Sequence, residues 1–326
     1  MGPSTTLFQH EAKGQPVPKD ETVNVEAFGA RKCPKLIEQV CSENPVTRRN
    51  ALAVLCDEMR NPVSVQGCVE AGMVGVLNNY ISKSEDPETK ARASRALALA
   101  AGDANGRRSM LEENSAGEVL PGIDDGDINV RSNVYEALVT LCKGTVPCLK
   151  AVIGAHYPSV LVSKAAAETP EVQPLVLQLM YQCLKDQSGL DDVLGSGGVK
   201  TCISLLESGA TPVRKEAAAT LGFLCFTEKA KRDAIKSGAV PLLCALLLDK
   251  SVEVKSAAAS ALMAITTTDE GKLALVPAKG GDALVEVFAD TDPVRERGLL
   301  LNVLKCISNA VVHPEVRASP RSLTRV

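Results

Sequence analysis

The feature that most constrains this chain is a repeat of about 41 residues. A basic or polar residue stands seven places before a core Leu or Met in six successive segments. These pairs are Arg48 and Leu55, Lys90 and Leu97, Arg131 and Leu138, Gln173 and Met180, Arg214 and Leu221, and Lys255 and Leu262. A seventh copy begins at Val294-Arg295 with a slipped apolar pattern. Self-similarity at this period is typical of proteins built from stacked units.

The start of each repeat predicts a helix. Five copies carry a capping residue followed by Pro, namely Asn44-Pro45, Asp86-Pro87, Thr169-Pro170, Thr211-Pro212 and Asp292-Pro293. A capping side chain accepts a free backbone N–H, and Pro is tolerated at the first helical position because it has no N–H to satisfy. Apolar residues then follow at helical spacing, as in Val213, Ala217, Leu221 and Leu224. No alternating strand pattern occurs, so we expect an all-α chain.

A glycine break followed by a second apolar helix lies between successive copies. The clearest example is Gly238 before Ala239-Val240-Pro241-Leu242-Leu243, and Gly72 and Gly198 stand at matching places. Gly ends one helix and Pro241 falls in the first turn of the next. A unit of two or three helices of this size cannot bury its apolar face alone, whereas stacked units share a continuous core. The sequence therefore predicts an α-solenoid.

Two stretches carry a family resemblance. The Gly-Ala-Val-Pro-x-Leu link at residues 238–243 resembles that of armadillo repeats, which implies a right-handed superhelix of about seven repeats. Residues 27–36 and Leu55-Cys56-Asp57 are similar to the family of the ciliary radial spoke head 14 homologue, also called rhabdoid tumour deletion region protein. We expect an extended N-terminal arm over 1–32, an armadillo solenoid over 33–312 and a C-terminal tail over 313–326.

The resemblance implies a non-enzymatic scaffold subunit of the axonemal radial spoke, which supports motility of cilia and flagella. Its partners would be other radial spoke and axonemal proteins, and its location the cytoplasm, the cytoskeleton and the axoneme. A second hypothesis is a cytosolic armadillo adaptor that binds extended peptides of partner proteins. A third is a ubiquitin ligase, but the roughly 32 residues before the first repeat are too few for a catalytic domain.

The amino-acid composition argues against nucleic-acid binding, a membrane span and a metal site. The chain has 36 Lys and Arg against 39 Asp and Glu, and only 3% aromatic residues, so neither a basic footprint nor stacking platforms for nucleic acid are expected. No apolar run reaches the ~18 residues of a membrane span. The 11 Cys and three His form no closely spaced ligand set, so no metal or other cofactor is expected. Cys56, Cys142, Cys183 and Cys225 fall at helical core positions, where thiols pack as small hydrophobes.

Three motifs favour structural roles over chemistry. Residues 125–129 with Glu136 imitate a calcium loop, but Val130 replaces its required Gly, so a helix-capping cluster is expected. The glycine-rich stretch 195–200 lacks the preceding strand of a phosphate loop and coincides with a repeat break. His156 stands at a repeat junction, where a structural role is expected.

In the armadillo family the third helix of each repeat lines a concave groove, and importin alpha holds basic peptides there with repeated Trp and Asn. The Asn-equivalent positions, two after each core residue, hold Asp57, Leu99, Thr140, Gln182, Phe223 and Ala264. The Trp-equivalent positions, two before it, hold Ala53, Arg95, Glu136, Gln178, Ala219 and Ser260. Neither array is present, which disfavours a nuclear-import receptor.

Helical periodicity still directs these positions toward one face. We therefore predict a groove that binds partner proteins through nine residues: Asp57, Arg95, Leu99, Glu136, Thr140, Gln178, Gln182, Phe223 and Ser260. Exposed apolar residues rimmed by polar ones tend to mark such surfaces. The alternative for Leu99 and Phe223 is that both rotate into the core.

Overall fold

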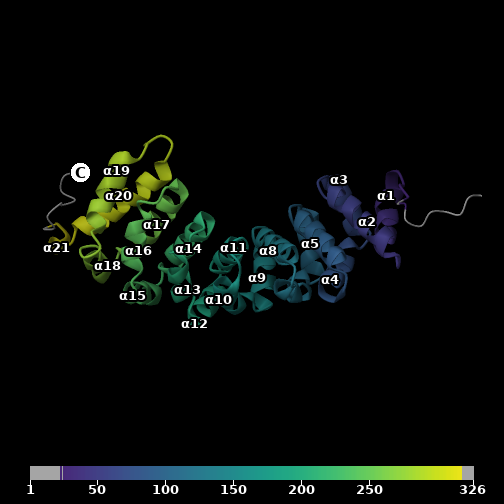
Figure 1. The fold of residues 1–326 in the computed structure, drawn as a ribbon, viewed down its shortest axis with the longest axis horizontal. Coiled ribbons are helices and arrows are strands. Elements are labelled where there is room, and N and C mark those ends of the chain that lie inside the picture. Colours follow the sequence, from purple (N-terminus) through teal and green to yellow (C-terminus); the bar gives the residue numbers. More distant parts are fainter. Residues whose placement is uncertain (1–22, 24, 318–326) are drawn as a thin grey trace, which may run out of the picture.

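The computed structural model describes residue 23 and residues 25–317, and within these residues all regular secondary structure is helical. The helices follow one another along the long axis of an open arc, from α1 at one end to α21 at the other (Figure 1). The prediction of an all-α solenoid is confirmed. The division into arm, solenoid and tail stays a prediction, and the described helices run from Lys32 to Arg317.

Each full unit contains two outer helices and one long inner helix. The long helices are α2 (Pro45–Glu58), α5 (Pro87–Ala101), α8 (Ile128–Cys142), α11 (Gln173–Cys183), α14 (Thr211–Leu224), α17 (Val252–Ile265) and α20 (Arg297–Val311). The first outer helices are α3 (Pro62–Glu70), α6 (Ala104–Glu112), α9 (Val146–Gly154), α12 (Gln187–Gly195), α15 (Glu228–Lys236), α18 (Asp269–Ala274) and α21 (Pro314–Arg317).

The second outer helix of each unit completes the layer. This set comprises α1 (Lys32–Val40), α4 (Met73–Lys83), α7 (Ser115–Glu118) with the 3-10 helix η2 (Leu120–Asp124), α10 (Tyr157–Ala167), α13 (Gly198–Leu205), α16 (Ala239–Leu246) and α19 (Gly280–Asp290). A 3-10 helix η1 (Gly29–Arg31) precedes α1. In the middle of the arc, α8, α11 and α14 lie on the inner, concave side, whereas α9, α10, α12 and α13 lie outside (Figure 1).

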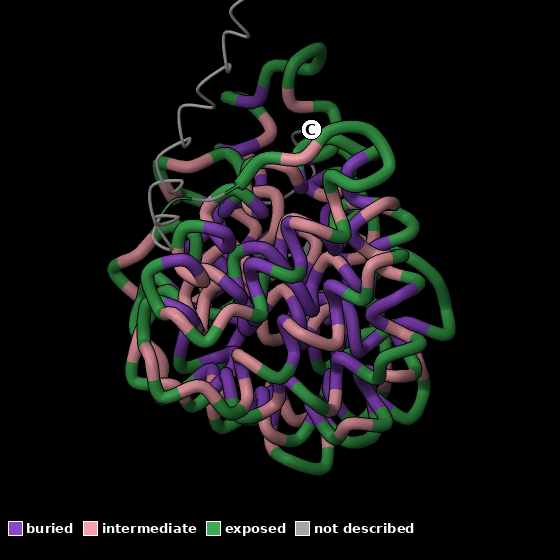
Figure 2. Tube along the Cα trace, turned by 90° about the vertical axis from the view of Figure 1, so that its right-hand side faces the viewer, coloured by how far each residue is buried: buried purple, intermediate pink, exposed green. Residues whose placement is uncertain are grey.

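Contacts between consecutive long helices build the core. The six core residues predicted from the repeat are all fully buried: Leu55, Leu97, Leu138, Met180, Leu221 and Leu262. Small residues let the helices approach closely, since a Cβ added at Gly222 on α14 would lie 3.2 Å from the Cα of Ala261 on α17. Seen from the N-terminal end, buried segments fill the interior of the stack (Figure 2).

The basic residue of the repeat fastens neighbouring units together. Arg131 donates through Nη1 to the carbonyl of Asp125 (2.8 Å) and through Nε to the carboxylate of Glu168 in the next unit (3.0 Å). Arg214 does the same with the carbonyl of Ser208 (2.8 Å) and the carboxylate of Asp249 (2.9 Å). Both ion pairs are largely buried, with side-chain exposures of 15% and 6%, and of 17% and 9%. Lys90 pairs with Asp125 of the next unit in the same way, whereas Gln173 donates to the carbonyl of Ala165, so this contact explains the basic residue in three of the six repeats.

The cap-Pro prediction is confirmed at Asn44, whose side chain accepts from the N–H of Val46 at the N-cap of α2. Asp86 stands at the N-cap of α5 as predicted, but its side chain makes no capping bond there. At Thr211 the helix begins one residue earlier than predicted, with Ala210 as N-cap. The cap-Pro prediction is wrong at Thr169 and Asp292, because α11 and α20 begin later in the sequence. The carboxylate of Asp292 instead accepts backbone N–H bonds inside a turn that precedes α20.

A left-handed residue makes the sharp turn between the two outer helices of each unit. Positive φ occurs at this place in six units, at Gly72, Asn114, His156, Gly197, Gly238 and Lys279. The glycine-rich stretch is therefore a helix junction, and the left-handed residue is Gly197 where the sequence suggested Gly198. The structural role expected for His156 is confirmed, since its φ of 62° makes the same turn.

We expect Gly197→Ala to lower the free energy of unfolding by about 1 kcal/mol, because a Cβ is disfavoured in the left-handed region. Space is not the cause, since an added Cβ would meet no heavy atom within 4 Å. Gly195→Ala is the matched control, because that Cβ is equally unhindered and the residue ends α12 with no left-handed φ. The control should be neutral or stabilising. Urea unfolding followed by circular dichroism measures both, and equal effects would contradict this account.

We expect Arg214→Ala to destabilise the chain by about 2–4 kcal/mol, because it leaves the carboxylate of Asp249 buried without its partner. Arg108→Ala provides the comparison, since Arg108 pairs with Glu112 at 2.9 Å in an exposed contact within α6. Exposed pairs contribute about 0–1 kcal/mol. A loss of similar size in the two variants would refute the claim that the arginines fasten the units.

Candidate protein-binding face of the long helices

The concave face is formed by side chains that the long helices do not use for stacking. Positions two before the core residue reach this surface in the C-terminal half, where Ala219 on α14 and Ser260 on α17 line a hollow of about 560 Å³. The hollow extends from Tyr181 on α11 to Leu299 and Asn302 on α20. Four long helices therefore contribute to one continuous depression.

The nine predicted groove residues differ in accessibility. Asp57, Arg95 and Glu136 are exposed, and Gln182 is buried. The half-buried residues are Leu99, Thr140, Gln178, Phe223 and Ser260. Leu99 and Phe223 pack against the core while keeping part of their surface in solvent, so neither alternative considered for them holds fully.

Two polar pairs cross between units on this face. Arg95 Nη1 on α5 lies 3.0 Å from Glu136 Oε2 on α8, and both side chains are about half exposed, at 46% and 50%. Gln178 Nε2 on α11 donates to Glu216 Oε1 on α14 at 2.9 Å, and Lys215 also contacts this carboxylate. Exposed pairs contribute little to stability, so Arg95 and Glu136 can exchange their contact for those of a partner at small cost.

An aromatic cluster, made of Tyr181, Phe223 and Phe226, joins α11 to α14, the two helices that carry Gln178 and Glu216. The rings of Tyr181 and Phe223 meet edge to face with centroids 5.3 Å apart, and those of Phe223 and Phe226 do so at 5.8 Å. Lys185 places its ammonium group 5.6 Å from the centre of the Tyr181 ring. Phe226 is 63% exposed. The chain has only five Phe and four Tyr, so three in one cluster mark this spot as unusual.

Sequence reasoning selected Phe223 but missed Tyr181 and Phe226. Tyr181 directly follows the core residue Met180, and Phe226 lies just beyond the end of α14. The only available signal was the rarity of aromatic residues, because the cluster joins α11 to α14 across 42 positions of sequence.

The buried thiols have a structural role. Burial raises the pKa of Cys142 and Cys225 to about 12, so both stay protonated near neutral pH and behave as apolar core residues. Cys183 is buried and Cys56 half-buried, in line with the predicted core packing. Within residues 25–317 no group of three or more His, Cys, Asp or Glu is placed to hold a metal ion.

The residues that imitate a calcium loop have other partners. The carboxylate of Asp125 pairs with Lys90 Nζ at 2.8 Å, and the side chain of Asp127 caps α8 by accepting from the N–H of Asn129. The predicted capping cluster is therefore confirmed. No helix in the described part of the chain is long and apolar enough to cross a membrane.

Comparisons with known proteins agree with this geometry. Residues 227–262, which contain α15, α16 and most of α17, match the armadillo/beta-catenin-like repeat. The chain is 32% identical over 325 residues to radial spoke protein 14 of Chlamydomonas reinhardtii, covering 94% of this chain and 82% of that protein. The chain belongs to the radial spoke protein 14 family. The family resemblance noted in the sequence is thereby confirmed.

Solved structures share the fold. An engineered protein is 25% identical with a TM-score of 0.79, and the match covers 87% of this chain and 69% of that one. A designed armadillo repeat protein in complex with the peptide (KR)4 is 20% identical with a TM-score of 0.66, covering 72% of this chain and 99% of that one. The second likeness establishes the armadillo fold alone.

The two phenylalanines of the aromatic cluster should respond differently to truncation. We expect Phe223→Ala to cost about 2 kcal/mol, since the ring packs against the core and between two other rings. Phe226→Ala should cost about 0.5 kcal/mol or less, because most of its surface is already in water. Urea unfolding of the two variants tests this, and equal losses would show that Phe226 is part of the core.

Proposed function

We propose that this protein is a non-enzymatic scaffold subunit of the axonemal radial spoke in cilia and flagella, where it supports motility through protein–protein contacts. The observation that carries the proposal is its 32% identity to radial spoke protein 14 across 94% of the chain. The partners are other radial spoke and axonemal proteins. The protein accordingly resides in the cytoskeleton of the cilium.

The concave face provides a physical means of binding. A partner that covers the aromatic cluster would remove apolar surface from water, and exposed aromatic side chains are frequent anchors of protein interfaces. Six of the nine predicted groove residues offer polar contacts along the long helices, namely Asp57, Arg95, Glu136, Thr140, Gln178 and Ser260. Gln182 accepts a bond from Lys185 at 2.6 Å and is buried. Binding here needs no bond-making chemistry.

A cytosolic adaptor that binds extended peptides is the second candidate. The hollow of about 560 Å³ favours it, since this space suits an extended chain that crosses several long helices. The hollow mixes Lys215 and Arg295 with Glu216 and Glu253, so it has no uniform charge with which to select a basic peptide such as (KR)4.

Axoneme fractionation tests the proposal. A tagged chain expressed in ciliated cells that lack the endogenous protein should remain with salt-washed axonemes. Phe226→Glu should reduce that retention about tenfold or more, because it places a charge where a partner would bury a ring. Val146→Glu is the matched control, since Val146 is 64% exposed but lies on the outer helix α9.

The outcomes separate the hypotheses. Recovery of the unmodified chain in the soluble fraction would contradict the spoke assignment and favour the adaptor. Normal retention of Phe226→Glu would refute the use of the aromatic cluster and leave the spoke assignment standing.

A further inference from the structure

The first long helix, α2, has one face that no described helix covers. In later units the residue directly before the core Leu or Met faces the preceding long helix, as Thr220 does when its hydroxyl donates to the carbonyl of Leu177. These residues are Ala96, Ala137, Leu179, Thr220 and Ala261, and all are buried. The equivalent residue of α2 is Val54, which is 40% exposed.

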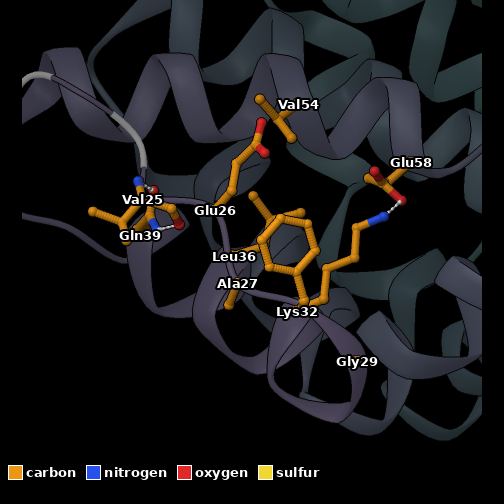
Figure 3. A pocket seen from close by; sticks show the side chains of 10 residues that line it. Val25, Glu26, Ala27, Gly29, Lys32, Leu36, Gln39, Val54 and Glu58 are labelled. Carbon is orange, nitrogen blue, oxygen red and sulfur yellow. Dashed lines mark hydrogen bonds and ion pairs between the residues drawn. The ribbon is translucent and has the colours of Figure 1, made fainter.

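The chain before α1 shapes this end of the stack into a pocket. Buried Gln39 holds the backbone of Val25 by two bonds, donating to its carbonyl at 2.6 Å and accepting from its N–H at 3.2 Å. Figure 3 shows this pair on one side of the pocket, with Leu36 and Val54 between it and the ion pair of Lys32 with Glu58. The space between these walls is about 240 Å³.

Three exposed side chains around the pocket are apolar, and they stand beside the exposed charged residues Glu26 and Lys32. Phe28 is 84% exposed and Val25 40% exposed, and both line the pocket together with Val54. Large apolar side chains gathered at one exposed place tend to mark an interaction surface. This end of the solenoid therefore presents an apolar surface whose counterpart in every later unit is covered by a helix.

The charges at this end of the stack indicate what kind of helix would fit against α2. In the fourth unit Glu168, five residues before the repeat position Gln173, receives Arg131 from the preceding unit at 3.0 Å. Glu43 stands five residues before Arg48, at the offset of Glu168. This is one residue nearer than Asp125 and Asp249, which receive Lys90 and Arg214 six places before Arg131 and Lys255. Glu43 is exposed, and among the described residues no ion pair reaches it. Glu43 can therefore accept a basic residue from a helix that lies before α2, and no described residue supplies one.

The spacing of residues on the later long helices indicates what sequence a fitting helix would have. The basic residue that reaches forward precedes a residue facing the next unit by eight positions, as Arg214 precedes Gly222. In an α-helix such residues lie just over two turns apart and ~80° around the axis, so both can face the same neighbouring unit. A fitting helix therefore carries an Arg or Lys and, eight residues later, a small or medium apolar residue.

We infer that the N-terminal end of the stack binds an amphipathic α-helix of a partner protein, which lies against α2 as a preceding long helix would. Its apolar stripe covers Val54 and the pocket, and its basic residue pairs with Glu43. This inference goes beyond the scaffold role and holds equally for an adaptor. It also uses a surface distinct from the aromatic cluster.

A synthetic peptide tests the inference directly. The probe is a helix-stabilised peptide with the sequence of α8, residues 128–142, because it carries Arg131 and, eight residues later, Val139. We expect saturable binding to the full chain, measured by fluorescence anisotropy. Val54→Glu should weaken it at least tenfold, whereas the exposed control Val146→Glu should leave it unchanged. Thermal unfolding of each variant verifies that the fold is intact.

A charge exchange provides the decisive measurement. Glu43→Arg should weaken binding about fivefold, and a peptide with Arg131→Glu should restore binding to that variant but bind the unmodified chain poorly. Absence of saturable binding, or binding that ignores both Val54→Glu and the charge exchange, would overturn the inference. So would self-association of the chain that Val54→Glu abolishes in sedimentation experiments, because a second copy would then be the occupant.

Discussion

The structure depends on the burial of each long helix against the next. No unit has a core of its own, because Leu55, Leu97 and their equivalents are buried only when consecutive long helices meet. Close approach requires small residues, as at Gly222 against Ala261, and alignment requires the arginine contacts of Arg131 and Arg214. The packing demand is the same in each unit and imposes apolar and small residues at the same spacing, while the ionic contact recurs at Lys90, Arg131 and Arg214, so both leave a repeat in the sequence.

Stacking also decides which side chains remain for function. The basic residue seven places before the core Leu serves the contact between units, as Arg131 and Arg214 show, and is not available to a ligand. The positions two before and two after the core residue are less constrained, although Arg95 pairs with Glu136, Gln178 donates to Glu216 and Gln182 is buried. They vary from Asp57 to Leu99 to Phe223, and this variation is what a protein needs to recognise different partners along one rod.

The core and the order of helices could be predicted from the sequence because both follow from local spacing. The exact helix starts at α11 and α20 could not, since Pro174 falls at the start of α11 and the carboxylate of Asp292 closes a turn of its own. The aromatic cluster was only partly predictable. Phe223 lies at a repeat position, whereas Tyr181 and Phe226 contact it through the packing of α11 on α14, which no local pattern records.

The two proposed binding surfaces are physically independent. In a solenoid each unit contacts only its neighbours, so a change at one unit weakens rapidly along the stack. The pocket at Val54 belongs to α1 and α2, while the aromatic cluster belongs to α11 and α14, and the units of α5 and α8 lie between them. Occupation of one surface therefore leaves the other unchanged. A rod of this kind can hold two partners at a fixed separation, which is the mechanical property that a structural subunit requires.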